Sequence, residues 1–274
     1  EVIDNYRPDL IYFDFGLNRI PDKNKRELAA YYYNCAEEWE EEVEIIYKDF
    51  ISPPGIGLTD YERGRSDTLT YYRWMTDTTI GTKSWGYVED EEFKPLSTLI
   101  HNLIDRIAKN GYLMLNFGPK ANGDIPEEVK SRLKAIGNWI EVNKEAIYNT
   151  TPWVIAEEGP TKLVKSGGFC EEDEVKYTSS DLRFVTKENS LYVFSFGWPD
   201  SELIIKSLIK PPISNSKAKT MGEFQLIEVS DIKSIYLLGH EQRLKWSLSS
   251  KGLKIGLPTE KPCKYAYAFK IEWT

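Results

Sequence analysis

The sequence predicts an α/β domain followed by an all-β domain: a partial (β/α)8 (TIM) barrel and then a C-terminal antiparallel β-sandwich. In the first part, short apolar runs alternate with segments of helical periodicity, the pattern of βαβ units with buried parallel strands. Beyond Thr151, strands of about five to eight residues are separated by polar turns, as in a β-sandwich. We therefore expect a barrel domain over residues 1–150 and a sandwich domain over residues 151–274.

The barrel domain is expected to begin with an apolar strand within residues 7–16 that ends on Asp14. The carboxyl ends of such buried parallel strands hold the chemistry of α/β barrels. Pro95 suits the first position of a later helix, which Asn110-Gly111 ends. The remaining elements expected are a helix over 23–40, a strand over 43–48, a segment over 56–62 that leads to Glu62, a helix over 95–110, a strand over 112–117 and a helix over 126–147. These strands make up about half of an eight-stranded barrel.

The sandwich domain is expected to consist of short strands joined by hairpin turns. Residues 187–190 (Lys-Glu-Asn-Ser) and 249–252 (Ser-Ser-Lys-Gly) are of the types that favour such turns. The predicted strands are 174–177, 182–186, 191–196, 203–208, 224–229, 235–238, 244–248, 253–257 and 265–271. This domain shows no obvious cluster of catalytic side chains, so the candidate chemistry lies in the barrel domain.

The composition excludes several classes of function. The chain has 274 residues, 41% of them hydrophobic, so it can bury one sizeable core or two modest ones. Its net charge of -8 argues against nucleic-acid binding, which needs clustered Lys and Arg. The sequence contains no run of about 18 apolar residues, the length that a membrane-spanning helix needs. Three widely separated cysteines and two histidines predict neither a disulfide framework nor a His-rich zinc site.

Two carboxylates near strand ends are the strongest candidates for catalysis. Asp14 closes the first strand and Glu62 closes another, so both could face one pocket. A retaining glycosidase needs such a pair about 5–5.5 Å apart, one as nucleophile and the other as proton donor. Arg63 and Arg65 could tune Glu62 or bind a sugar hydroxyl, although arginines beside an acid usually form a solvated ion pair. The competing acids are Asp9, Asp60, Glu89, Asp90 and Glu91.

Several motifs in a fixed order carry a resemblance to a known family. Residues 8–14 (Pro-Asp-Leu-Ile-Tyr-Phe-Asp) resemble the nucleophile strand of the family 29 α-L-fucosidases, commonly written P-D-L-I-W-F-D-G. Later landmarks of that family are similar to residues 61–64 (Tyr-Glu-Arg-Gly), 84–87 (Ser-Trp-Gly-Tyr), 110–119 with Gly123, 146–153 and 158–160. Each motif is weak alone, but the ordered set is highly specific. The C-terminal strands also resemble the family's β-sandwich.

The resemblance implies hydrolysis of terminal α-L-fucose from glycoconjugates or oligosaccharides with retention of configuration, without a metal or cofactor. It implies that Asp14 is the nucleophile and that Glu62 is the acid/base. Tyr12, which stands two residues before the nucleophile, Arg63 and Trp85 are then candidates for substrate binding. Trp85 could stack against fucose or its leaving group, or pack at the rim of the pocket.

The chain departs from the family pattern in two ways. Phe15 replaces the Gly that usually follows the nucleophile, which would reshape the pocket beside Asp14. The family's fucose-binding histidines and early aromatic residues lie on strands before the nucleophile, and this sequence does not supply them. We therefore expect the C-terminal part of a fucosidase, and a companion polypeptide that completes the barrel.

An alternative is a catalytically silent fragment, or a carbohydrate-binding protein on a glycosidase scaffold. In either case the expected partner is a fucosylated glycan rather than a nucleic acid or a membrane. The family resemblance implies a periplasmic, secreted or lysosomal location. Turnover of a fucoside would separate the enzyme from the binding protein, because only the enzyme cleaves the glycosidic bond.

Overall fold

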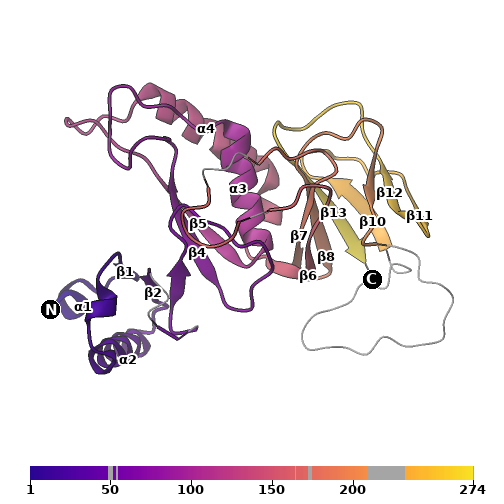
Figure 1. Cartoon of the computed structure of the whole chain (residues 1–274). Helices are drawn as coiled ribbons and strands as arrows, with labels where there is room; N and C mark the ends of the chain where they lie inside the picture. Colours follow the sequence, from indigo (N-terminus) through magenta and orange to yellow (C-terminus); the bar gives the residue numbers. More distant parts are fainter. Residues whose placement is uncertain (49–51, 54, 164, 172–174, 209–231, 274) are drawn as a thin grey trace, which may run out of the picture.

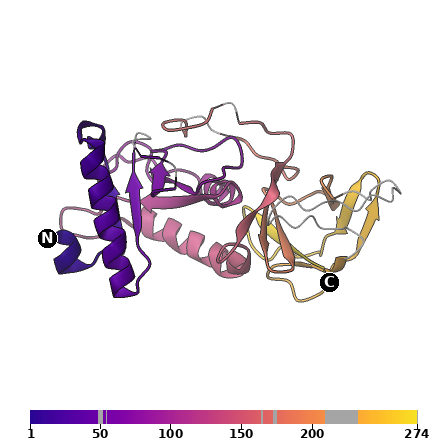
Figure 2. The same ribbon diagram turned by 90° about the horizontal axis from the view of Figure 1, so that it is seen from below.

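A computed structural model of the chain describes residues 1–48, 52–53, 55–163, 165–171, 175–208 and 232–273. Over these residues it confirms the expected fold class: a parallel sheet that forms half of a barrel, followed by two antiparallel sheets (Figure 1). Helix α2 (Asp22–Trp39) and the antiparallel sheets lie at opposite ends of the molecule in both views (Figures 1 and 2). The division into residues 1–150 and 151–274 stays a prediction.

The half barrel consists, in the described part of the chain, of parallel strands that pair in chain order, β1-β2-β3-β4-β5. Parallel neighbours need crossover connections, and α2 joins β1 to β2 while α3 (Leu96–Ala108) joins β4 to β5. The strands are β1 (Leu10–Phe13), β2 (Glu44–Tyr47), β3 (Leu58–Asp60), β4 (Trp74–Thr79) and β5 (Gly111–Asn116). Strands β1 and β5 are therefore the two edges of the described sheet.

Alternate residues of each parallel strand face opposite sides of the sheet. Tyr47 of β2 packs in a cluster with Tyr32 of α2, on the side that this helix covers. Ile46, the preceding residue, packs instead with Leu58 and Met75 of the neighbouring strands. The face opposite α2 is thus the inner face of the half barrel, and alternate residues of β1 to β4 point toward it.

The sandwich packs two antiparallel sheets around one apolar core. Among the described residues the larger sheet has the order β10-β13-β8-β7-β6 and the smaller has the order β11-β12-β9. Phe184, Val193 and Phe269 of the larger sheet share a core with Leu203 and Ile255 of the smaller. The strands are β6 (Thr151–Glu158), β7 (Leu182–Lys187), β8 (Ser190–Ser195), β9 (Glu202–Ile205), β10 (Ile232–Leu237), β11 (Trp246–Ser249), β12 (Gly252–Gly256) and β13 (Tyr267–Trp273).

Helices α3 and α4 (Glu127–Asn143) join the half barrel to the sandwich. The apolar stripe of α3 includes Ile100 and Ile104 at helical spacing, which is typical of a helix that buries one face. These residues and Trp139 of α4 form one core with Val185 and Phe194 on the outer face of the larger sheet. Neither of these helices, nor any other in the described ranges, is long and apolar enough to cross a membrane.

A buried ionic cluster also lies at this junction. The Nε of Arg183 in β7 donates to Oδ1 of Asp105 in α3 at 2.6 Å, and Nζ of Lys109 lies 3.0 Å from the same oxygen. Lys109 Nζ also lies 3.0 Å from Glu157 of β6. Burial by itself would raise the pKa of Asp105, but the charges of Arg183, Lys109 and Arg106 outweigh it and hold this pKa far below its ordinary value.

Most expected elements are present, with boundaries that differ by a few residues. The sequence pattern did not predict α1 (Val2–Tyr6), β4 or β6. Strand β4 reads Trp-Met-Thr-Asp-Thr-Thr, so it lacks the apolar run that marks a buried strand. The expected strand over 174–177 is wrong for residues 175–177, where Tyr177 packs its ring on Phe196 outside any strand. The expected strand over 224–229 lies outside the described residues.

Candidate active site

The carboxyl ends of β1 to β4 bring ionisable side chains to one edge of the half barrel. Asp14 directly follows β1, Lys48 directly follows β2, Asp60 ends β3 and Asp77 lies near the end of β4. Tyr12 stands two residues before Asp14 and so shares its face of the sheet. These side chains converge because parallel strands have their carboxyl ends at the same edge.

Lys48 lies at the centre of this group, which we call the Lys48 cluster: Tyr12, Asp14, Lys48, Asp60, Glu62 and Asp77. Its Nζ lies 2.7 Å from Oδ1 of Asp14 and 2.7 Å from Oε2 of Glu62. Since both oxygens lie at this distance from one nitrogen, they are at most twice that distance apart. The Nζ also lies 3.5 Å from Oδ2 of Asp77 and 4.0 Å from Oδ2 of Asp60. A lysine therefore brings together the two acids that the sequence singled out.

The surroundings of Lys48 favour its charged form. Burial by itself would lower the pKa of Lys48. The hydrogen bonds to Asp14 and Glu62, together with the charge of Asp77, outweigh burial and raise this pKa above its ordinary value. The ammonium also lies 4.8 Å from the centre of the Phe15 ring, a cation–π contact. Phe15, which stands where the family pattern has Gly, thus stabilises the Lys48 ammonium.

Asp60 forms a more buried layer of the cluster with Tyr12 and Asp77. The Tyr12 hydroxyl donates to Oδ2 of Asp60 at 2.6 Å and lies 3.3 Å from Oδ2 of Asp77. Burial raises the pKa of Asp60 to about 7; the Tyr12 hydrogen bond opposes this shift and the charge of Asp77 adds to it. Burial and the bond to Asp60 likewise raise the pKa of Tyr12. Tyr12 thus links two acids, and its contact with substrate stays a prediction.

Arg63 and Trp85 lie on the loops around the cluster. The Arg63 guanidinium lies 3.5 Å from the carbonyl oxygen of Thr82. Trp85 follows β4 on the same loop as Thr82, and its carbonyl accepts a hydrogen bond from the Asn116 amide at 2.7 Å. In the described part of the chain, no hydrogen bond or ion pair joins either side chain to Lys48. Their roles in substrate binding stay predictions.

The remaining competing acids lie outside the cluster. Asp9 precedes β1, so it lies at the opposite edge of the sheet. Asp90 is 85% exposed and lies 3.1 Å from Nζ of Lys83. Glu91 accepts backbone hydrogen bonds within the same loop from Thr82 and Lys83 at 2.9 Å each and from Glu92 at 3.1 Å, and Glu89 lies nearby in sequence. These contacts give Asp90 and Glu91 a structural role in the loop after β4.

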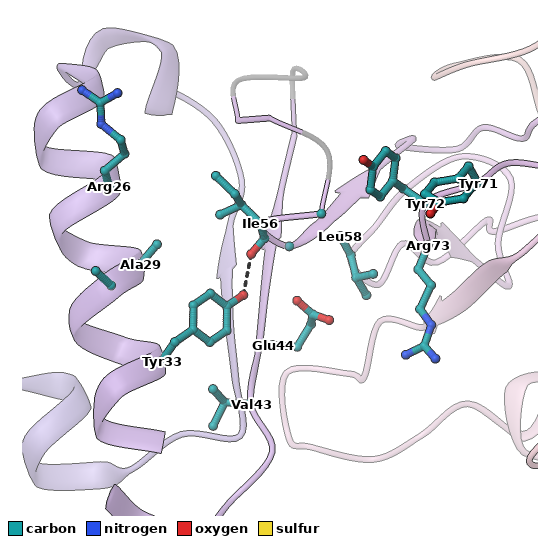
Figure 3. Close-up of a pocket in the computed structure, with 13 residues that line it drawn as sticks. Arg26, Ala29, Tyr33, Val43, Glu44, Ile56, Leu58, Tyr71, Tyr72 and Arg73 are labelled. Carbon is teal, nitrogen blue, oxygen red and sulfur yellow. Dashed lines mark hydrogen bonds between the residues drawn. The ribbon is translucent and has the colours of Figure 1, made fainter. Parts of the chain in front are cut away.

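A separate cavity of about 660 Å³ lies at the amino ends of the strands (Figure 3). Figure 3 shows the Tyr33 hydroxyl of α2 bonded to the carbonyl of Ile56, with Glu44 and Arg73 on the strand side. Glu44 begins β2 and Arg73 directly precedes β4, which places this cavity at the edge opposite Lys48. Because α/β barrels hold their chemistry at the carboxyl ends of the strands, the candidate active site is the Lys48 cluster.

Sequence reasoning missed Lys48 and Asp77. Lys48 ends the strand predicted over 43–48, so its position at a strand end was the available signal. Asp77 lies in β4, which was not predicted because its sequence is polar. The polar residues Thr76, Thr78 and Thr79 of this strand are nevertheless buried.

The cluster suits nucleophilic and acid/base chemistry. The side chain of Asp14 is 57% exposed, whereas that of Glu62 is 11% exposed. One acid is therefore open to a ligand and its partner is recessed beside it. The Lys48 ammonium takes the central position among the carboxylates. Within the described ranges, no group of three or more His, Cys, Asp or Glu is arranged to hold a metal ion.

Two family models match this chain. The model of the family "Alpha-L-fucosidase" matches residues 1–145, which include the whole Lys48 cluster. The model "Alpha-L-fucosidase C-terminal domain" matches residues 172–272. The first match alone covers more than half of the chain.

Individual proteins agree with the family models. The chain is 29% identical to tissue alpha-L-fucosidase of Bos taurus, over 100% of this chain and 52% of that protein. It is 27% identical to plasma alpha-L-fucosidase of Homo sapiens, over 99% of this chain and 53% of that protein. The crystal structure of Thermotoga maritima alpha-fucosidase superimposes with a TM-score of 0.69 at 22% identity, over 98% of this chain and 54% of that one. The chain spans about half the length of these relatives, and it belongs to the alpha-L-fucosidase family.

Proposed function

We propose that this chain carries the reacting carboxylates of a retaining glycosidase that removes terminal α-L-fucose from glycoconjugates or oligosaccharides. The observation behind this proposal is that one oxygen of Asp14 and one of Glu62 each lie 2.7 Å from Nζ of Lys48. Twice that distance is the upper limit on their separation, and retaining glycosidases need carboxyl groups about 5–5.5 Å apart. Family membership and the named relatives support fucose as the sugar.

In this proposal the more exposed acid, Asp14, attacks the anomeric carbon of fucose. As the bond from that carbon to the leaving oxygen breaks, Glu62 gives its proton to the leaving oxygen. A water molecule then loses a proton to Glu62 and attacks the same carbon, which releases Asp14 and yields α-L-fucose. Lys48 contacts both carboxyl groups through its ammonium, which limits their separation before substrate binds.

We also propose that polypeptide outside these 274 residues completes the barrel, whether as a separate companion or as an attached segment. Strands β1 and β5 are open edges of the described sheet, and open edges recruit further strands. Tyr112 of β5 is 46% exposed and Leu10 of β1 is 42% exposed. We expect residues 1–274 alone to self-associate, which light scattering would measure. A soluble, folded monomer would contradict this proposal.

The proposed function fits a secreted, periplasmic or lysosomal location. Relatives of this chain are named tissue and plasma enzymes, which supports a compartment where glycans are degraded or circulate. Fractionation of the natural source, with fucosidase activity followed in each fraction, would check the location. Activity confined to the cytosol would contradict it.

The function is tested with the full natural protein and an aryl α-L-fucoside. We expect turnover in the wild type and a loss of about 10⁴-fold or more in Asp14→Asn, because the amide cannot form the glycosyl ester. Asp9→Asn is the matched control, since it changes the same residue type at the other end of β1. NMR of the first product should show the α anomer.

Three other results would point elsewhere. Full activity in Asp14→Asn would remove Asp14 from the reaction. Initial release of the β anomer would exclude retention. Saturable fucose binding without turnover by the wild type would favour the carbohydrate-binding alternative.

A further inference from the structure

A short segment between β6 and β7 lies against the backbone segment that carries the candidate acid/base. We call residues 165–171, which follow β6, the strap. The N–H of Phe169 donates to the carbonyl of Glu62 at 2.7 Å. Gly167 and Arg65 exchange two backbone hydrogen bonds, of 2.7 and 3.1 Å. The strap therefore pairs with the segment that carries Glu62, at the carboxyl edge of the half barrel.

Glu171 anchors the end of the strap in the protein interior. Its N–H donates to the carbonyl of Arg63 at 2.9 Å. Its side chain is 5% exposed and accepts hydrogen bonds from Nζ of Lys94 at 2.8 Å, from the Asn102 amide at 2.9 Å and from the Thr78 hydroxyl. Charge-assisted bonds to a buried carboxylate are among the stronger side-chain bonds in proteins. The strap is thus held in one position over the ends of β3 and β4.

Phe169 is a largely exposed aromatic residue with an unfavourable backbone conformation. Its side chain is 66% exposed, so it contributes little to any core. Its φ of 54° lies in the left-handed region, where a bulky residue is an outlier and Gly would be more favourable. Outliers of this kind concentrate where a side chain serves a ligand. The bond from its N–H to the carbonyl of Glu62 fixes the backbone of Phe169 beside the backbone of the candidate acid.

The position of an acid/base defines where the leaving group lies. The acid must reach the oxygen that joins fucose to its leaving group, so the first ring of that group lies beside Glu62. We propose that the strap forms one wall of the leaving-group subsite and that Phe169 stacks on the first ring of the leaving group, a sugar or an aryl ring. This inference rests on the proposed function, and it makes Phe169 a determinant of leaving-group specificity.

The test compares two substrates in the full natural protein. α-L-Fucosyl fluoride has no ring in its leaving group, whereas 4-nitrophenyl α-L-fucoside has one. We expect Phe169→Ala to lower kcat/KM for the aryl fucoside on the order of tenfold, the size of a lost apolar contact, and to leave kcat/KM for the fluoride unchanged. Phe169→Gly should show the same selectivity and an unchanged or higher Tm, because it relieves the left-handed backbone.

Tyr148→Ala is the matched control, since Tyr148 is also an aromatic residue exposed on a loop, at 57%. It should leave both substrates unaffected. Equal losses on both substrates in Phe169→Ala, or no loss on either, would overturn this inference while leaving the proposed function intact. A wild-type protein inactive on both substrates would overturn the proposed function and this inference with it.

Discussion

At the scale of single residues, Lys48 sets the electrostatics of the candidate site. One ammonium faces the carboxylates of Asp14, Asp60, Glu62 and Asp77 within 4.0 Å. Such a group carries excess negative charge, and it stays compact because the lysine bonds directly to the two outer acids. Asp60, in the buried layer of the cluster, differs from the two outer acids, because burial and its neighbour Asp77 favour its neutral form.

Asp60 should make the stability of the protein fall as the pH rises. Its pKa is about 7 in the folded protein, above its ordinary value of 3.8, so the folded state binds a proton more tightly than the unfolded state. Its stabilising contribution is complete below about pH 4 and is lost as the pH rises through about 7. The slope from this group is at most about 1.4 kcal/mol per pH unit.

Asp60→Asn should flatten this dependence, because the amide stays neutral throughout. The free energy of unfolding in urea, measured from pH 4 to pH 8 for wild type and variant, gives the difference between them. Exposed Asp200→Asn is the control and should follow the wild type. Parallel curves for wild type and Asp60→Asn would contradict the raised pKa.

At the scale of elements, the strap and the segment after β3 are fitted to each other through Gly64. A Cβ at Gly64 would lie 2.1 Å from the carbonyl oxygen of Gly167 and 2.6 Å from that of Tyr61. These are backbone atoms, so the strap itself would have to move. Glycine is required here by close approach between two backbones, since the φ of Gly64 is not positive.

Gly64→Ala should therefore lower both stability and activity. We expect a loss of about 1–3 kcal/mol in the free energy of unfolding. In the proposed mechanism, turnover should fall about 10²-fold, because a displaced Glu62 would not meet the leaving oxygen. Gly137→Ala in α4 is the matched control: its Cβ meets open space, and a helical Gly→Ala change should add about 0.5–1 kcal/mol. Equal effects of the two substitutions would contradict the close fit.

At the scale of the whole molecule, the half barrel and the sandwich share an apolar core and the buried ionic cluster of Asp105, Lys109, Glu157 and Arg183. Both Asp105 and Arg183 have side chains no more than 2% exposed. A buried ion pair adds little over an apolar pair of the same shape, but the loss of one partner leaves an uncompensated charge. The junction is therefore sensitive to single substitutions and more tolerant of paired ones.

Arg183→Met should destabilise the protein by about 3–5 kcal/mol, because Asp105 loses its closest cation. The loss in the double variant with Asp105→Asn should be smaller than the sum of the two single losses, by a coupling of about 0.5–3 kcal/mol. Urea unfolding of the wild type, both single variants and the double variant measures this coupling. Strictly additive losses would show that the two side chains act independently.

Much of this protein follows from local patterns in its sequence. The strand before Asp14, the helices begun at Pro95 and Pro126 and most sandwich strands depend on apolar periodicity and turn residues, which act over a few residues. The polar strand β4 was missed because burial of its threonines depends on neighbours far away in sequence. Asp14 and Glu62 were chosen as candidates because each stands at the end of a predicted strand, and their catalytic roles stay predictions.

The sequence by itself therefore determined the fold class, most of the elements and the choice of Asp14 and Glu62 as candidates. Tertiary structure decided that Lys48 joins those acids, that Asp60 is buried beside Asp77, and that the strap lies on the segment of Glu62. These contacts join residues from separate strands or, as with Phe169 and Glu62, residues far apart in the sequence. Their physical cause is the convergence of parallel strand ends at one edge, which no local pattern of residues records.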